Sequence, residues 1–200
     1  KIFEISFQLP KSDQGIFSFM LRSTINEYKN AFQIENVRLK RKGSSFFCIQ
    51  NKFLIGISRS LLITFVIYFL GSNTALICYL ISAFISKILL ETINYVEHYG
   101  LIRVPGEPVM LRHSWNSNHV ASSALLYNLN RHSSHHEKAN LKYWEFKSYP
   151  DAPMLPYGYL HCLYVAYFAP FLFKKMMKPK LEEWDNNFAS DTEKQLLSTN

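Results

Sequence analysis

The longest apolar block of the sequence covers residues 53–95 and is divided by a short polar break. It reads FLIGISRSLLITFVIYFL, then GSN, then TALICYLISAFISKILLETINY. Each half has about the 20 residues that cross a bilayer core as a helix. The basic residues that flank the block are Arg38, Lys40, Arg41, Lys42 and Lys52 before it, and Arg103 and Arg112 after it. The positive-inside rule therefore predicts a transmembrane helical hairpin with both outer ends on the cytoplasmic side.

Two basic residues lie inside this block, Arg59 in the first half and Lys87 in the second. Both are near the outer ends of the hairpin, where long basic side chains can extend to the membrane interface. The alternative interpretation is a buried helical hairpin of a soluble protein. We favour it less, because few soluble helices stay apolar on every side over such a length.

The residues before the block have the period of an amphipathic helix. From Phe17 to Lys42, apolar residues recur every three or four positions, and Gly43 follows as a typical helix stop. The basic end of this segment suits a membrane interface, although an ordinary surface helix of a globular protein has the same pattern. We expect residues 1–52 to form a cytosolic or interfacial region with this helix, and residues 53–95 to form two transmembrane helices.

The chain beyond the block is polar and rich in His, Asn and Ser. We expect residues 96–175 to form a cytosolic cap that carries the histidines. Residues 111–137 lack Pro and Gly and can form one helix. The apolar stretch 161–173 is too short to span a bilayer and is expected to be interfacial or buried. Residues 176–200 are predicted to be a polar C-terminal tail.

The composition excludes a disordered chain and limits the partner classes. Hydrophobic residues make up 48% and charged residues only 18% of the 200 residues, so ample apolar surface is available for burial. The net charge of +7 suggests either nucleic acid or an anionic membrane surface. The basic residues cluster beside the apolar block, which favours membrane lipid and argues against nucleic acid. The three cysteines are far apart, without a CxxC pair, which fits a reducing compartment.

Histidines carry the candidate chemistry of the sequence. The seven are His98, His113, His119, His132, His135, His136 and His161. The motif HSSHH places three of them at i, i+3 and i+4, on one face of a helix. Imidazole nitrogens without a nearby cysteine suit Fe, Zn or Cu better than Mg or Ca. The pattern therefore favours a metal site, although a polar helix with solvated histidines has the same spacing.

Two segments resemble a known family. Residues 94–101 read NYVEHYGL and residues 129–136 read LNRHSSHH, with HSWNSNH between them and DAPMLPYGY after them. The order and form of these segments are similar to those of the integral-membrane alkane 1-monooxygenases, which belong with the membrane fatty-acid desaturases and hydroxylases. The hallmark of that family is N-Y-x-E-H-Y-G-L, and its last histidine box is L-Q-R-H-S-D-H-H. This sequence departs from the box at Asn130 and Ser134.

The resemblance implies a fold and a ligand set. The fold is an all-α integral-membrane bundle capped by a cytosolic, non-haem di-iron site, and this chain would supply the C-terminal portion. The implied iron ligands are His98, His132, His135 and His136, with no catalytic residues beyond them. Supporting roles fall to the neighbouring Glu97, Ser134, His113 and His119. Ser134 replaces an aspartate of the family, which bears on redox tuning but removes no ligand.

The resemblance also implies an activity, which is the O₂-dependent terminal hydroxylation of medium- or long-chain alkanes to 1-alkanols. Electrons would come from a rubredoxin-type donor. The two earlier histidine boxes of the family, H-E-x-x-H-K and E-H-x-x-G-H-H, are not in this sequence. Five expected histidine ligands and about four spans would precede Lys1, so we expect these 200 residues alone to be inactive. The alternatives are a membrane fatty-acid desaturase or hydroxylase, and an inactive truncated form.

Overall fold

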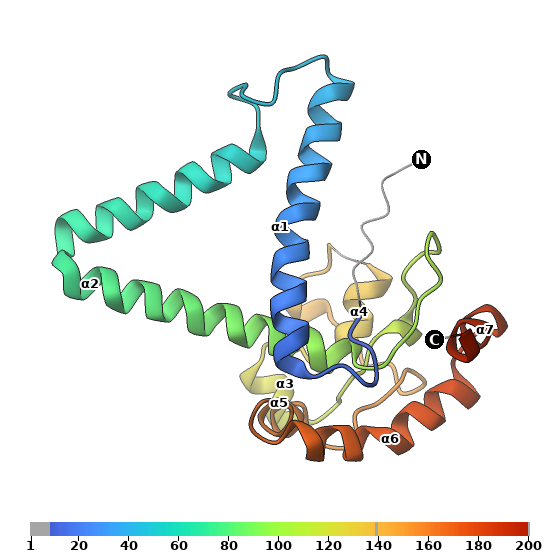
Figure 1. Ribbon diagram of the computed structural model, residues 1–200. Helices are drawn as coiled ribbons and strands as arrows, with labels where there is room; N and C mark the ends of the chain where they lie inside the picture. The colour runs from blue at the N-terminus through green and yellow to red at the C-terminus, as the bar shows by residue number, and fades with distance from the viewer. Residues whose placement is uncertain (1–8, 139, 200) are drawn as a thin grey trace. The chain divides into compact units, whose positions relative to one another are not determined.

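The computed structural model describes residues 9–138 and 140–199 of the chain, and helices are its regular elements (Figure 1). No strand is formed by the residues described, which confirms the all-α fold class. The elements are α1 (Ile16–Arg41), α2 (Lys52–His98), η1 (Leu111–His113), α3 (Val120–Leu125), α4 (His132–Glu137), η2 (Tyr143–Glu145), α5 (Tyr159–Phe168), α6 (Pro170–Asn187) and α7 (Asp191–Thr199). They form two compact units. The first contains residues 21–91, and the second contains the described residues of 9–20 and 92–199.

Helix α2 carries the apolar block and is bent in its middle. Figure 1 shows two straight arms that meet at the bend, where Ser72 has a left-handed backbone with φ of 68°. The bend lies within the GSN break of the sequence. The most apolar window of α2 has a mean hydropathy of 2.1, and none of it is buried within the protein. Apolar side chains exposed on all sides of a helix this long belong in a bilayer, not in the core of a soluble hairpin.

The first unit joins α1 to α2 through a polar link at the start of α2. The side chain of Asn51 caps this helix by accepting a hydrogen bond from the backbone N–H of Leu54 at 3.0 Å. Glu35 of α1 accepts a further bond from the N–H of Lys52 and is held by Arg38 in a salt bridge of 2.5 Å. The carboxylate thus lies at the positive end of the α2 dipole. The hydrogen bonds of Asn51 and Glu35 explain why α2 begins at Lys52.

Lys87 connects the two helices of this unit a second time. Its ammonium contacts Glu27 of α1 at 2.5 Å and Glu91 of α2 at 2.5 Å. The Glu91 side chain is only 1% exposed, whereas the Lys87 side chain is 31% exposed. The positive charge therefore compensates a carboxylate that has lost nearly all of its contact with solvent.

Replacement of Lys87 with Met is expected to lower the free energy of unfolding by about 3 kcal/mol, because Glu91 would remain buried without its cation. Thermal unfolding in one detergent measures the effect. Lys180→Met is the matched control, since it breaks an exposed pair with Glu183 and should cost less than about 1 kcal/mol. Equal unfolding temperatures for the two variants would contradict this assignment of Lys87.

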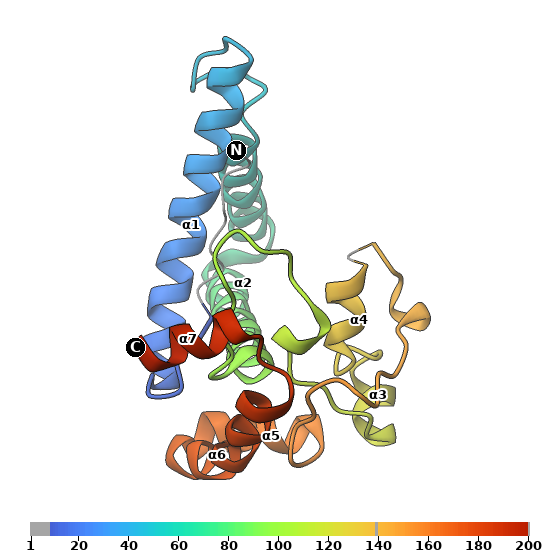
Figure 2. The same cartoon turned by 90° about the vertical axis from the view of Figure 1, so that its right-hand side faces the viewer.

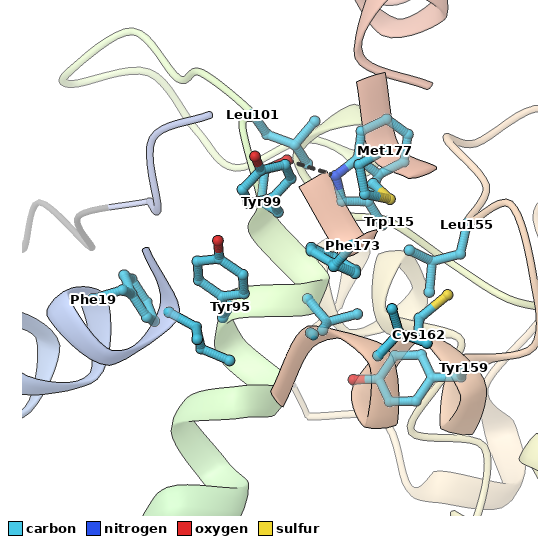
Figure 3. Packing of buried hydrophobic residues seen from close by; sticks show 14 of the residues in the cluster. Phe19, Tyr95, Tyr99, Leu101, Trp115, Leu155, Tyr159, Cys162, Phe173 and Met177 are labelled. Carbon is cyan, nitrogen blue, oxygen red and sulfur yellow. Dashed lines mark hydrogen bonds between the residues drawn. The ribbon is translucent and has the colours of Figure 1, made fainter. Parts of the chain in front are cut away.

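The second unit is built on an aromatic core (Figure 3). Tyr95 of α2 and Tyr99, which directly follows the end of α2, pack against Phe173 of α6 with ring centroids 5.8 and 5.2 Å away. The indole of Trp115 donates to the Tyr99 carbonyl at 2.8 Å. The buried cluster consists of Ile16, Phe19, Tyr95, Val96, Tyr99, Leu101, Trp115, Leu155, Tyr159, Cys162, Val165, Ala166, Phe173, Met177 and Trp184. The last turns of α2 are therefore fixed by core packing, and His98 lies at their end.

The glycine of NYVEHYGL is required by the way α2 ends. Gly100 has φ of 71°, a left-handed conformation that favours glycine at helix ends. A Cβ atom there would lie 2.5 Å from the side chain of Leu181, and the Gly100 N–H donates to the carbonyl of Pro10 at 2.8 Å. This close approach sets the exit of the chain immediately after His98.

The expectation of one helix over residues 111–137 is wrong. The segment contains η1, α3 and α4, with extended backbone and turns between them (Figure 2). The backbone N–H of Trp115 donates to Glu97 O, and that of Asn116 donates to Pro153 O. Tyr127 and Asn128 have positive φ, which ends the helix before them. Hydrogen bonds to distant segments thus replace the local helical bonds that the composition allows.

The stretch expected as a polar tail is helical and contributes to the core. Helices α6 and α7 occupy most of residues 176–199, and Met177 and Trp184 are fully buried. Glu193 of α7 is also fully buried. The sequence pattern did not indicate this burial, because Trp184 and Glu193 each stand between polar neighbours and Met176 and Met177 lie between lysines.

Candidate metal centre

Three imidazoles meet in the second unit and form the candidate centre. The metal-binding atoms offered by His98, His132 and His136 all lie within 4.8 Å of one another. His98 ends α2, whereas the other two lie one turn apart on α4. The rings of His98 and His136 are nearly parallel, with centroids 5.3 Å apart, and the His132 ring stands across both. The cluster therefore joins His98 to two histidines that lie at least 34 positions further along the sequence.

An acceptor fixes the Nδ1 atom of each ring. His98 Nδ1 lies 2.9 Å from the carbonyl oxygen of His113, and His136 Nδ1 lies 3.4 Å from that of Met110. His132 Nδ1 lies 3.3 Å from a carboxylate oxygen of Glu97. Because the two carbonyl oxygens can only accept, Nδ1 of His98 and Nδ1 of His136 carry the proton, and Nε2 carries the lone pair that binds a metal. Glu97 sets His132 in the same tautomer when its carboxylate is ionised. The three rings are thus set in the tautomer that a metal centre uses.

Burial keeps these rings neutral. It lowers the pKa of His98 to about 3 and the pKa of His136 to about 4, with the positive charge of nearby ionised groups adding to the effect. The pKa of His132 is lowered further for the same reasons. A histidine must be neutral to bind a metal, so protons compete with a metal at this centre only in acid.

Glu97 is buried beside His132 and is itself held by Tyr159. The hydroxyl of Tyr159 donates to Glu97 Oε1 at 2.7 Å, and Glu97 Oε2 faces His132. Burial raises the pKa of Glu97 to about 8, against the effect of the Tyr159 hydrogen bond. A cation bound by His132 favours the ionised carboxylate. Tyr159 thus holds Glu97 by a hydrogen bond, and Glu97 in turn contacts His132, so this chain of contacts orients one ring of the cluster.

The sequence did not indicate Tyr159, and its removal is a direct test of this chain. Tyr159→Phe keeps the ring in the core but deletes the bond to Glu97, so the free energy of unfolding should fall by about 1.5 kcal/mol or more. Calorimetry of the metal-free protein measures this. The control is Tyr99→Phe, which deletes a hydroxyl bonded to Ser12 O in the same unit. Both variants should lose stability, and only Tyr159→Phe should also weaken Zn²⁺ binding. Equal Zn²⁺ affinities would contradict the role of Tyr159.

Helix α4 is only six residues long and depends on Asn116 for its position. The Asn116 side chain accepts from the N–H of Ser133 at 2.8 Å and donates to the Ser133 hydroxyl at 2.5 Å. That hydroxyl donates in turn to Leu111 O in η1. These bonds attach the first turn of α4 to η1, which places His132 and His136 opposite His98. Asn116 and Ser133 carry no sequence signal of this role.

The remaining predicted site residues are distributed around the cluster. His135 is exposed and is not one of the three converging histidines, although its ring centroid lies 5.6 Å from that of His132. It lies about 100° from His136 around the helix, which directs it away from His98. Ser134 is buried and accepts from the N–H of Lys147. His113 is buried against Glu193, whereas His119 is exposed at the start of α3.

Comparison with known proteins places this chain in a family. The sequence profile of the fatty acid desaturase family matches residues 3–171. The xylene/toluene monooxygenase hydroxylase component XylM of Pseudomonas putida is 30% identical over 94% of this chain and 50% of its own length. An alkane 1-monooxygenase of Acinetobacter baylyi is 37% identical, and alkane 1-monooxygenase 2 of Alcanivorax borkumensis is 33% identical. Each of these two matches covers 86% of this chain. They cover 43% of the Acinetobacter baylyi protein and 46% of the Alcanivorax borkumensis protein. The chain spans about half the length of the curated relatives it matches.

Proposed function

This chain belongs to the fatty acid desaturase family, and from that premise we propose that it is part of a non-haem iron monooxygenase of hydrocarbons. The observation that carries the proposal is the convergence of His98, His132 and His136 with their Nδ1 atoms held by acceptors. Alkane 1-monooxygenases and XylM are among the relatives that match the chain. The proposed centre lies on the cytoplasmic side of the membrane, which the basic residues around the apolar block support.

The donor set fits iron. All three ligand atoms are imidazole nitrogens, which suit Fe, Zn and Cu, and iron is the redox-active metal that the family resemblance implies. When bound, iron supplies the activation of O₂ that attack on an unactivated C–H bond requires. In the proposed reaction, one hydrocarbon, one O₂, two electrons and two protons are converted to one alcohol and one water. A rubredoxin-type carrier would supply the electrons, and a second iron would complete the di-iron centre.

The protein residues contribute orientation, neutral ligands and exclusion of water. Two carbonyls and Glu97 engage the Nδ1 atoms of the rings, which leaves Nε2 of each ring to bind the metal. Burial of His98 keeps water from that side of the centre and holds the ring unprotonated. His135 lies on the exposed side, outside the three converging rings, where we propose that it binds the second iron. Acid–base chemistry has no means of activating an apolar C–H bond, so we assign no general acid or base.

The substrate class is a hydrocarbon that reaches the centre from the bilayer, which the exposed apolar surface of α2 supports. Terminal hydroxylation of medium- or long-chain alkanes is the first candidate. Hydroxylation of a methyl group on an aromatic ring is the second. The match to XylM supports it, because it covers more of the chain than the alkane 1-monooxygenase matches do.

The proposal is tested with the full-length protein in membranes, an electron-donor system and ¹⁸O₂. Octane, hexadecane, toluene and a fatty acyl substrate are supplied in parallel. The expected result is an alcohol that contains one ¹⁸O atom from an alkane or from toluene. His161→Ala is the matched control and should keep activity, because His161 is exposed and outside the cluster. A desaturated acyl product without ¹⁸O, or no product from any hydrocarbon, would contradict the proposal.

A further inference from the structure

A buried carboxylate from the C-terminal helix contacts the segment that supports the histidines. Glu193 of α7 is fully buried, and its Oε1 lies 2.7 Å from His113 Nε2. Its Oε2 accepts from Arg112 Nε at 3.0 Å and from the backbone N–H of Ser190 at 2.8 Å. In Figure 2, α7 lies beside the loop that follows α2, in agreement with these contacts. Glu193 therefore binds two consecutive residues of η1 with both oxygens.

The same turn supplies the acceptors for two rings of the candidate centre. Met110 directly precedes η1 and is bonded to its last residue: the N–H of Met110 donates to His113 Nδ1 at 3.0 Å, and the N–H of His113 donates to Met110 O at 3.0 Å. The carbonyl oxygens of these two residues face the Nδ1 atoms of His136 and His98. A shift of this turn therefore moves the acceptors of both rings together.

Glu193 is a costly way to hold a turn if stability alone is required. A buried carboxylate loses its hydration, and an apolar residue of similar size often gives equal or greater stability. Glu193 instead fixes the direction of the His113 ring, which must donate from Nε2 to Glu193 and accept at Nδ1 from Met110. That geometry is specific, because each ring nitrogen has one partner of the correct kind.

We propose that Glu193 is a positioning residue of the metal centre, which acts through His113 and η1 to orient the rings of His98 and His136. The inference rests on the proposed function in treating these rings as metal ligands. It assigns to the C-terminal helix a role in metal binding that its polar sequence does not suggest. Glu193 itself does not touch the metal or the substrate.

The test uses the protein in detergent with Co²⁺ as a spectroscopic substitute for iron. Glu193→Ala should weaken Co²⁺ binding about tenfold, as loss of residues that orient metal-ligating histidines does. The visible Co²⁺ bands should also change, because the ring angles change. Glu193→Gln keeps the size and loses the charge, so it should give a smaller change of the same kind and serves if Glu193→Ala does not fold.

Tyr95→Phe is the matched control for lost stability. It deletes a 2.8 Å hydrogen bond to Gln14 O in the same unit, without a link to the histidines. It should lower the unfolding temperature while keeping the wild-type Co²⁺ spectrum and affinity. Wild-type spectra and affinities in both Glu193 variants would overturn the inference.

A metal-free measurement separates this inference from the proposed function. The ¹⁵N spectra of the histidines report which ring nitrogen carries the proton. In the wild type His98 and His136 should be protonated at Nδ1, and in the Glu193 variants this preference should weaken. If wild-type protein bound no Co²⁺ but the ¹⁵N spectra changed as expected, the proposed function would fail and the orienting role would stand. Unchanged ¹⁵N spectra would overturn the orienting role.

Discussion

His132→Ala should reduce the metal affinity of the centre more than about 100-fold, whereas His135→Ala should reduce it far less. His132 is one of the three converging ligands, and its ring centroid lies 4.6 Å from that of His136 and 5.2 Å from that of His98. Loss of an orienting residue alone typically costs roughly 10- to 100-fold, so loss of a ligand should cost more. His135 is exposed and outside the converging set.

Competition between Co²⁺ and a fluorescent chelator measures both affinities on the same preparation. The two histidines are matched, because they are of one type and lie on the same six-residue helix. His161→Ala should equal the wild type. An equal loss in the His132 and His135 variants would mean that α4 binds metal through a different set of its histidines.

Glu97→Ala should produce the second largest effect, on both affinity and stability. The substitution leaves His132 Nδ1 and the Tyr159 hydroxyl in a buried place without their shared acceptor. Metal affinity should fall roughly 10- to 100-fold. The free energy of unfolding of the metal-free protein should fall by about 2 kcal/mol or more, because buried polar groups lose their partner.

Glu97→Gln is the matched variant for this prediction. Its amide oxygen can accept from His132 while its amide nitrogen donates to the Tyr159 oxygen, so most of the stability should return. Isothermal titration with Zn²⁺ and thermal unfolding without metal separate the two effects. Wild-type Zn²⁺ affinity in Glu97→Ala would show that Glu97 does not orient His132.

The helices that bear long periodic patterns were predictable from the sequence. The apolar period of 17–42 corresponds to α1 within one residue at each end, and the apolar block corresponds to α2 with its bend at Ser72. Such patterns arise because side chains on many consecutive turns are buried or face the bilayer. The helices can therefore be predicted from local periodicity, without information on contacts between distant residues. His98 follows the end of this block by three residues, and α2 ends at His98.

The segment 111–137 was not predictable in this way. Its course is set by single hydrogen bonds to residues far along the chain, such as Trp115 N–H to Glu97 O and Asn116 to Ser133. Single hydrogen bonds of this kind leave no periodic pattern in the sequence. Glu193 was missed because one buried acid in a polar helix looks like a solvated acid in the sequence. Tertiary contacts that involve one residue at a time thus decide the geometry of the candidate centre.

Iron K-edge X-ray absorption of the iron-loaded protein shows whether His98, His132 and His136 bind iron together. If they do, the spectrum has a first shell of nitrogen with the outer-shell pattern of imidazole rings. The imidazole contribution should decrease in His136→Ala and stay unchanged in His161→Ala. A first shell of oxygen without imidazole scattering, or an identical spectrum in His136→Ala, would contradict iron binding by these three histidines.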